Sequence, residues 1–154
     1  MSDQTPTAAY GEDLARIGLT GSRTWPDRAL LEATLMDVWH DATQLGYRGI
    51  LLTHGACEEG ADDMGDDWAF AHGVPQDPHR ADWRGPCAPN CPTGHRRRGR
   101  RGEYCPMAGH RRNQLIVDLR PLLLVAAHHN QSTGTADCMR RADAAGIPVR
   151  RIVA

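Results

Sequence analysis

The chain has 154 residues, of which 40% are hydrophobic and 24% charged, and its formal net charge is −1 at pH 7. This length fits one domain with a sizeable core, and no apolar run approaches the roughly 20 residues that a membrane-spanning helix needs. The sequence starts without a basic, apolar leader, so we expect residues 1–13 to be a disordered tail of a cytoplasmic protein with reduced cysteines.

Strand and helix patterns alternate along the first half of the chain. Short apolar runs that close on glycine are typical of buried strands entering turns. Pro26 and Gly46 bracket a segment with apolar residues at three-to-four spacing, which is the pattern of a helix. The predicted elements are strands over 16–23, 47–55 and a weaker, proline-interrupted 74–82, and helices over 25–46 and 60–73.

The second half ends in the same alternation, with helices predicted over 110–119 and 133–146 and strands over 120–128 and 147–153. The strongest strands are apolar on both faces, which is typical of a parallel sheet covered by helices on both sides. We therefore predict an α/β, Rossmann-like open sheet of about five strands with helices on both faces. Residues 14–154 are expected to form this single domain.

Residues 84–110 interrupt the alternation, and no stretch of them has the pattern of a regular helix or strand. The segment is too long to be a simple connecting turn. Between Arg84 and Arg112 there are eight arginines against the single acid Glu103. This charge fits a solvated loop, and contact with a nucleic acid backbone is the alternative, although no recognition helix accompanies the run.

Three cysteines and a histidine in this segment have the spacing of a zinc site. The run Cys87-x3-Cys91-x3-His95-x9-Cys105 supplies three thiolates and one imidazole, a set that suits tetrahedral, structural Zn²⁺. A structural zinc contributes on the order of 10–16 kcal/mol, which would fold a loop with almost no apolar content. We predict a zinc-knuckle insertion over 84–110.

Other arrangements of this segment stay open. His79 and His110 are competing fourth ligands, and a flexible loop with incidental cysteines is the alternative to a metal site. The insertion lies directly before Arg111 and Arg112. We therefore expect a zinc-stiffened lid that presents arginines to an anionic ligand.

Three loops with small and hydroxyl residues follow predicted strands, over 20–27, 54–62 and 129–137. In an open parallel sheet such loops meet at the carboxyl edge, where helix N-termini attract anions. Neither the dinucleotide-binding G-x-G-x-x-G nor a P-loop is present. Glycines let backbone N–H groups approach an anion, and hydroxyls and one arginine add donors: Gly21, Ser22, Arg23, Gly55, Gly60, Ser132, Gly134 and Thr135.

The ordered motifs "TGSR", "HGACEEGADDMGDDWA", "ADW", "AGHRRN" and "STGTAD" followed by "AGIPV" resemble the SLOG superfamily. They are most similar to its YspA/cpYpsA-related branch from bacteria and phages. Across residues 16–153 the resemblance implies a Rossmann-like domain that binds a nucleotide or a nucleotide-derived phosphorylated ligand. It implies that the 55–62 loop and the Gly134-Thr135 turn hold phosphate or ribose. It also implies that Arg23, Asp62, Trp83, Arg112 and Asn113 line the pocket, where Trp83 is a candidate to stack on a base.

The chain departs from the distantly related cytokinin-activating phosphoribohydrolases at one decisive position. Their signature P-G-G-x-G-T-x-x-E ends in a glutamate that acts on the N-glycosidic bond, and Cys138 stands at that position here. The departure favours a sensor, sequestering or regulatory protein over an enzyme. A phosphoribohydrolase-type hydrolase of nucleoside monophosphates is the alternative, with Asp137 or one of the strand-end histidines His54, His128 and His129 in place of the glutamate. A weaker alternative is a nucleic-acid-associated zinc protein. The resemblance also implies a homodimer, because related domains often form homodimers.

Overall fold

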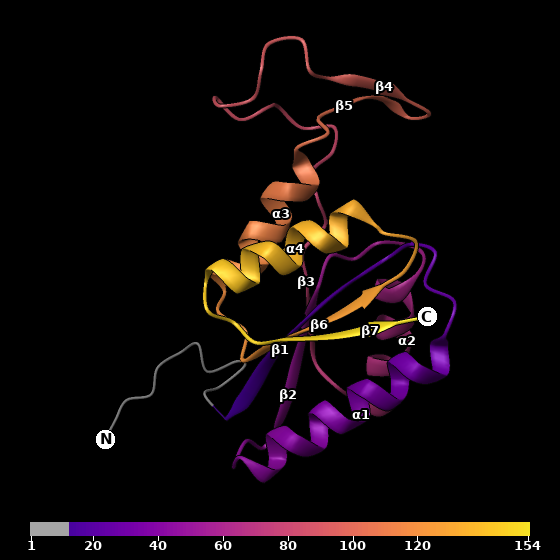
Figure 1. The fold of residues 1–154 in the computed structure, drawn as a ribbon, viewed down its shortest axis with the longest axis vertical. Coiled ribbons are helices and arrows are strands. Elements are labelled where there is room, and N and C mark those ends of the chain that lie inside the picture. Colours follow the sequence, from indigo (N-terminus) through magenta and orange to yellow (C-terminus); the bar gives the residue numbers. More distant parts are fainter. Residues whose placement is uncertain (1–12) are drawn as a thin grey trace.

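The structure, a computed structural model, describes residues 13–154 and confirms the Rossmann-like α/β fold (Figure 1). Five parallel strands form one sheet in the order β3-β2-β1-β6-β7. Four helices connect them. The strands of this sheet are β1 (Leu14–Gly21), β2 (Gly49–His54), β3 (Gln76–Pro78), β6 (Leu123–His128) and β7 (Val149–Val153), and the helices are α1 (Arg28–Gln44), α2 (Ala61–His72), α3 (Ala108–Asp118) and α4 (Thr133–Ala144).

The helices cover both faces of the sheet, as the apolar strands predict. Leu35 of α1 and Trp68 of α2 belong to the buried cluster on one face, together with residues of β1 and β2. Val117 of α3 and Ala142 of α4 pack on the other face against β6. Each helix therefore buries one apolar stripe against the sheet, and β2, in the interior of the sheet, is buried along its whole length.

Helix α1 begins where the sequence places a capping signal. The side chain of Asp27 accepts a hydrogen bond from the backbone N–H of Leu30 at 2.9 Å, so it satisfies a donor that the helix leaves free. The chain turns at Gly46, where φ is +103°. The start of α1 and the turn that follows it are therefore fixed by local residues.

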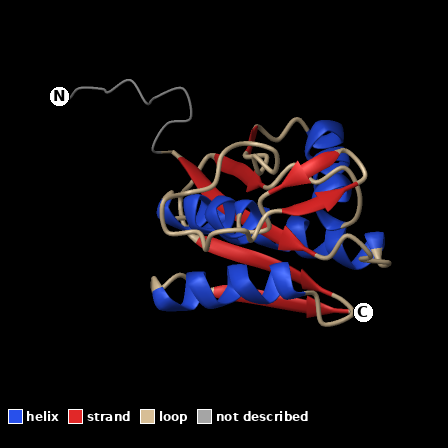
Figure 2. Cartoon of the chain, turned by 90° about the horizontal axis from the view of Figure 1, so that it is seen from above, coloured by secondary structure: helices blue, strands red, loops and turns tan. Residues whose placement is uncertain are grey.

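The segment between β3 and α3 is an insertion that does not belong to the five-stranded sheet. We call residues 84–107 the cysteine insertion; it lies beyond α3, away from the sheet, and is mostly loop (Figures 1 and 2). Our expectation of no regular structure here was wrong, because β4 (Arg97–Gly99) and β5 (Gly102–Tyr104) form an antiparallel hairpin. Helix α3 starts at Ala108, so the last three residues of the predicted insertion are helical.

The predicted N-terminal tail lies outside the described residues, apart from Asp13. The carboxylate of Asp13 pairs with the Arg48 guanidinium at 2.7 Å, so this residue belongs to the ordered chain. Among the helices formed by residues 13–154, none combines the length and the apolar character that crossing a membrane demands.

Candidate functional site: a three-loop cavity beside a Cys3His cluster

The three loops predicted to meet do surround one cavity, of about 490 Å³, at the carboxyl edge of the sheet. They follow β2, β1 and β6, which are three consecutive strands of the sheet. The first turns of α3 and α4 close the remaining sides. All the predicted ligand residues except Gly60 line it: Gly21, Ser22, Arg23, Gly55, Asp62, Trp83, Arg112, Asn113, Ser132, Gly134 and Thr135.

Gly60 packs two of the loops together instead of lining the cavity. Its φ is +79°, a backbone conformation that side chains disfavour. A Cβ atom there would collide with the carbonyl oxygen of Ser22 and the backbone of Arg23. The glycine therefore permits the close approach of the first and second loops, and its predicted role as a ligand contact stays a prediction.

Two of the predicted hydroxyl donors already have protein partners. Ser22 Oγ donates to the His129 carbonyl at 2.9 Å and accepts from the His129 N–H at 2.8 Å, which ties the first loop to the third. Ser132 Oγ caps α4 by accepting from the Thr135 N–H. These hydroxyls shape the cavity, and the N–H groups of Thr133 and Gly134 at the start of α4, which have no intrahelical acceptor, stay available for a ligand.

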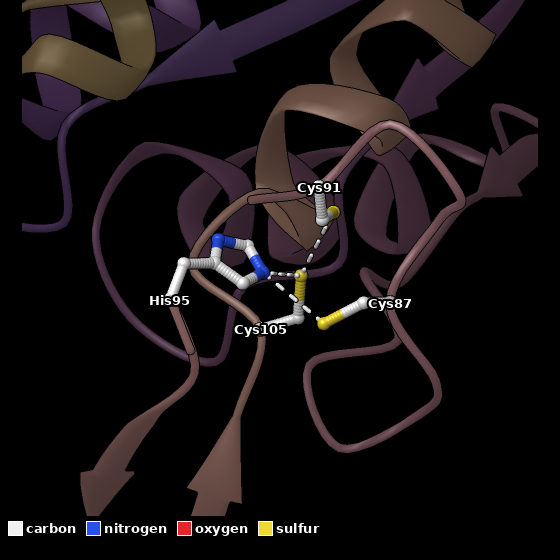
Figure 3. Close-up of side chains that lie close together, drawn as sticks. All are labelled: Cys87, Cys91, His95 and Cys105. Carbon is white, nitrogen blue, oxygen red and sulfur yellow. Dashed lines mark hydrogen bonds between the residues drawn. The ribbon is translucent and has the colours of Figure 1, made fainter. Parts of the chain in front are cut away.

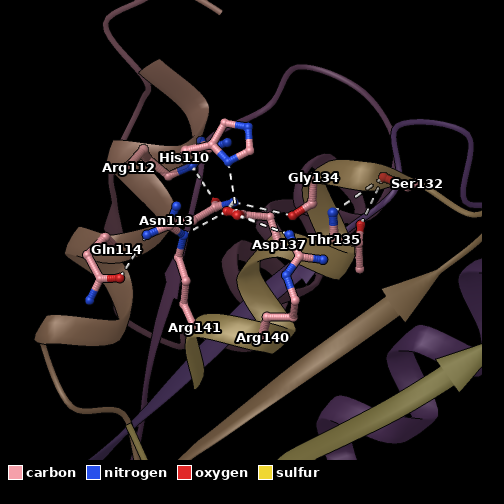
Figure 4. A network of polar contacts seen from close by, with 10 residues as sticks. All are labelled: His110, Arg112, Asn113, Gln114, Ser132, Gly134, Thr135, Asp137, Arg140 and Arg141. Atoms are coloured by element: carbon pink, nitrogen blue, oxygen red, sulfur yellow. Dashed lines mark hydrogen bonds and ion pairs between the residues drawn. The ribbon is translucent and has the colours of Figure 1, made fainter. Parts of the chain in front are cut away.

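Arg112 and Asn113 connect the second and third loops across the cavity (Figure 4). Arg112 Nη1 donates to the Gly55 carbonyl at 2.7 Å, and its Nε donates to Asn113 Oδ1 at 3.1 Å. Asn113 Nδ2 in turn donates to the Gly134 carbonyl at 3.2 Å. The pair thus holds one wall of the cavity in place.

Asp62 brings a buried carboxylate to the cavity wall, with only 4% of its surface exposed. Its Oδ2 accepts from the Cys57 N–H at 3.3 Å, while Oδ1 has no hydrogen-bond partner among residues 13–154. Burial raises the pKa of Asp62, against the opposing charges of His54 and Arg112. An unpaired buried acceptor is costly, so this oxygen is suited to a ligand hydroxyl.

Asp137, one of the groups considered as a substitute for the missing glutamate, is fully engaged away from the cavity (Figure 4). It accepts from Arg141 Nε at 2.8 Å and Asn113 Nδ2 at 3.0 Å, and His110 Nδ1 lies 2.9 Å away. Burial alone would raise its pKa, but these partners lower the pKa of Asp137 to about 2. A carboxylate held in this way is a poor base at neutral pH.

His54 and Cys138 do not line the cavity either. The two ring nitrogens of His54 are occupied, since Nε2 hydrogen-bonds with Gln76 Oε1 at 2.7 Å and Nδ1 accepts from the Ala56 N–H at 3.0 Å. Cys138 is buried, and burial raises the pKa of its thiol to about 11. The residue that replaces the glutamate therefore serves packing against the sheet.

Trp83 lies at the mouth of the cavity, between the sheet body and the cysteine insertion. Its ring meets Tyr104 edge-on, with centroids 6.1 Å apart. A Cβ atom on Gly109 would lie 2.9 Å from the Trp83 ring, so the glycine in the first turn of α3 makes room for the indole. The sequence analysis missed Gly109 and His110 as lining residues, although "AGHRRN" had marked this turn.

Cys87, Cys91, His95 and Cys105 come together in the cysteine insertion, with their ligand atoms all within 4.8 Å of one another (Figure 3). Cys91 Sγ and Cys105 Sγ are 3.9 Å apart, and His95 Nε2 lies 3.1 Å from Cys87 Sγ and 3.4 Å from Cys105 Sγ. Tetrahedral Zn²⁺ with bonds of about 2.0–2.3 Å separates its ligands by roughly 3.5–3.8 Å. These three separations between ligand atoms are near those values, so the cluster is compatible with a tetrahedral metal site.

The two alternative histidines lie elsewhere. His79 Nε2 is 3.0 Å from Asp77 Oδ2, and His110 pairs with Asp137. Neither belongs to the group of close ligand atoms that contains His95. His95 is thus the histidine that completes the set of four.

Two arginines surround the cluster and donate toward its sulfurs. Arg96 Nη1 lies 3.5 Å from Cys87 Sγ and also donates to the Gly85 carbonyl. Arg111 Nη1 lies 3.5 Å from Cys91 Sγ and 3.6 Å from Cys105 Sγ. Burial raises the pKa of Cys105, but its hydrogen bonds, the one from Arg111 first, lower it to about 6. These cations favour the thiolate forms that a metal needs.

Arg111 and Arg112, the arginines expected to face an anionic ligand, lie in different surroundings. Arg111 turns toward the sulfurs, while Arg112 lines the cavity. Successive residues on a helix point about 100° apart, so one turn of α3 serves both sites. The metal cluster and the cavity therefore share a structural element.

These features define a Rossmann-like domain with a cavity at the carboxyl edge of its sheet and a Cys3His cluster inserted before α3. Residues 15–85 match the sequence model of the YAcAr family, described as the "YspA, cpYpsA-related SLOG family". The chain is 33% identical over 141 residues to the Gene 61 protein of Mycobacterium phage D29, a match that covers 88% of this chain and 94% of that protein. The chain belongs to the YspA, cpYpsA-related SLOG family. No solved structure matches it.

Proposed function

We propose that this protein binds a nucleotide or a nucleotide-derived phosphorylated ligand in the three-loop cavity and acts as a sensor, sequestering or regulatory protein without turnover. The observation that carries the proposal is the meeting of three loops and the α4 N-terminus around one cavity of about 490 Å³. This volume is within the range of small-molecule sites. Family membership supports a nucleotide-related ligand.

The walls of the cavity suggest how such a ligand lies. A Cβ atom on Gly134 would meet nothing within 4 Å, so the first turn of α4 is open to the cavity and suits a phosphate. The unpaired Oδ1 of Asp62 suits a ribose hydroxyl. Trp83 offers an aromatic face for a base.

A zinc ion in the Cys3His cluster is part of the proposal. It would be held by Cys87, Cys91, His95 and Cys105 and would fix the loop that carries Trp83 and the start of α3. Its role is structural, because four protein ligands leave no open position. All five cysteines of the chain are free thiols, which agrees with a reducing, cytoplasmic location.

Binding without turnover is favoured over hydrolysis because Asp137 and His54, two of the proposed substitutes for the glutamate, do not line the cavity. His129, which does line it, hydrogen-bonds through Nδ1 with Thr24 Oγ1 at 2.8 Å. Asp137 is held by α3 and α4, and His54 is held by Gln76 and its own loop. Incubation with nucleoside monophosphates should therefore release no free base. Release of base at a rate above that of the buffer would favour the phosphoribohydrolase alternative.

The proposal is tested with Gly134→Asp, which adds a negative charge at the start of α4. An acid in the first turn suits the helix dipole, and the position has room for a side chain, so the fold should be kept. We expect at least tenfold weaker binding of nucleoside 5′-monophosphates by isothermal titration calorimetry. Ala29→Asp is the matched control, because it adds the same charge to the exposed first turn of α1, outside the cavity. Equal affinities in both variants would refute a phosphate site at α4.

A further inference from the structure

A second cavity, of about 530 Å³, adjoins the first and lies between the cysteine insertion and the loop after β2. One wall comes from the β4–β5 hairpin, which the sequence analysis did not anticipate. The two cavities share five lining residues, so they are direct neighbours and two linked parts of one ligand could occupy both. The residues common to both linings are Arg23, Gly55, Cys57, Trp83 and Arg112.

The second cavity is strongly basic. Six arginines and two glutamates line it. Arg80 is paired with Glu58 at 3.4 Å, but Arg100 and Arg101, at the tip of the hairpin, have no ion-pair partner among residues 13–154. Unpaired guanidinium groups around a hollow favour a phosphate or another anion.

Two aromatic side chains also line this cavity. Trp83 and Tyr104 pack edge to face with an interplanar angle of 80°, and both are only partly buried. Aromatic faces beside arginines are the usual means by which proteins hold unpaired bases. The cavity thus combines groups for a phosphate with groups for a base.

The order of these groups along the two cavities follows the order of groups in a dinucleotide. The α4 N-terminus, suited to a first phosphate, lies in the first cavity only. Asp62, suited to a ribose, contacts the N–H of Cys57 in the shared wall. The unpaired arginines lie in the second cavity only. In a 5′-phosphorylated dinucleotide, the first ribose likewise lies between the 5′ phosphate and the linking phosphate.

We propose that the second cavity binds the second nucleotide of a linear, 5′-phosphorylated dinucleotide whose first nucleotide occupies the three-loop cavity. This inference rests on the proposed function, since the first nucleotide takes the site assigned there. Arg100 and Arg101 bind the linking phosphate, and Tyr104 contacts the second base. Trp83, which lines both cavities, keeps its contact with the first base. The cysteine insertion is then the part of the protein that selects two-unit ligands over mononucleotides.

The test compares the 5′-phosphorylated homodinucleotides of the four bases with the matching mononucleotides, by calorimetry on the full chain loaded with zinc. At least one dinucleotide should bind tenfold or more tightly than its mononucleotide. Arg100→Ser combined with Arg101→Ser should remove that advantage and leave mononucleotide affinity within twofold. Arg97→Ser combined with Arg98→Ser is the matched control, because it removes the same charge from the same hairpin at exposed residues that line neither cavity.

Each outcome separates the two proposals. If mononucleotides bind and no dinucleotide binds better, the second subsite is refuted and the proposed function stands. If none of these probes binds, both fail. Equal losses in the two double variants would show general charge attraction and overturn the inference. A 5′-phosphorylated octanucleotide that binds tenfold more tightly than the dinucleotide would also overturn it, in favour of single-stranded nucleic acid.

Discussion

The sheet body and the cysteine insertion are stabilised in opposite ways. In the body, apolar side chains such as Ile17 and Leu35 are completely buried, and the free energy of folding is spread over many contacts. In the insertion, Cys105 is the main buried apolar side chain, and it belongs to the metal cluster. If the proposed zinc is bound, stability is distributed in one region and concentrated in four ligand atoms in the other, so the two should respond differently to the same kind of change.

The largest expected effect is on the insertion, when the metal is removed. Cys105→Ser, or treatment with a strong chelator, removes folding free energy on the order of 10 kcal/mol that only this region uses. Amide hydrogen exchange over residues 84–107 should then become fast, while the strands of the sheet stay protected. Metal analysis of the purified wild type should give one zinc ion per chain.

Ile17→Ala is the corresponding test of the sheet body, because it should destabilise the sheet and leave the insertion unchanged. This substitution leaves a cavity in the core and should lower the free energy of unfolding by about 2–5 kcal/mol, with no change in zinc content.

A Cys105→Ser protein that keeps a full equivalent of zinc would contradict the assigned cluster. So would an insertion that stays protected after chelation.

A smaller effect is expected at Asp137, which links α3 to α4 near the base of the insertion. Its partners lower the pKa from its usual 3.8 to about 2, so the unfolded chain binds more protons between these values. The contribution to stability is thus complete above about pH 4 and is lost as the pH falls toward 2. Asp137→Asn should lower the free energy of unfolding by about 2 kcal/mol at pH 7.

Urea unfolding at pH 7 and at about pH 3 measures this dependence, and the difference from the wild type should shrink at the lower pH. Asp143→Asn is the control, because this exposed carboxylate on the same helix has no ion-pair partner among residues 13–154. Equal effects of both substitutions would show that charge on α4, and not the network around Asp137, is what matters.

The smallest effect, and the opposite sign, is expected at Asp62. Burial raises its pKa, so the folded state binds the extra proton, and stability falls as the pH rises from about 4 toward the raised value. Asp62→Asn removes the buried charge. Relative to the wild type, the free energy of unfolding of this variant should be on the order of 1 kcal/mol higher at pH 7 than at pH 4. The same variant should bind nucleotides more weakly than the wild type. A variant that is less stable at pH 7 than at pH 4, relative to the wild type, would contradict this assignment.

The sheet could be predicted from the sequence because its strands and helices carry their signals locally. Apolar runs mark β2 and β6, and Asp27 and Gly46 mark the limits of α1. The three-loop cavity followed from topology alone, because loops after parallel strands share one edge. Likewise, the spacing of the cysteines identified the four residues that come together in the insertion.

What the sequence could not show depends on contacts between distant segments. The hydrogen bond between Ser22 and His129 and the close contact of Gly60 with the first loop both depend on how the loops pack. The hairpin tip at Arg100 and Arg101 had a local signal in its flanking glycines, since Gly102 has a φ of +107°. The short strands beside it hold no apolar alternation, so their pairing could not be read from periodicity.

The double hydrogen bond between Ser22 and His129 has a consequence for affinity. It joins the loops after two neighbouring strands, β1 and β6, so the floor of the cavity is built before any ligand arrives. A molecule entering the site loses its own motional freedom but need not immobilise these segments. For the proposed ligand, recognition on this side would be close to lock and key, and the adjustment that remains would fall on the cysteine insertion.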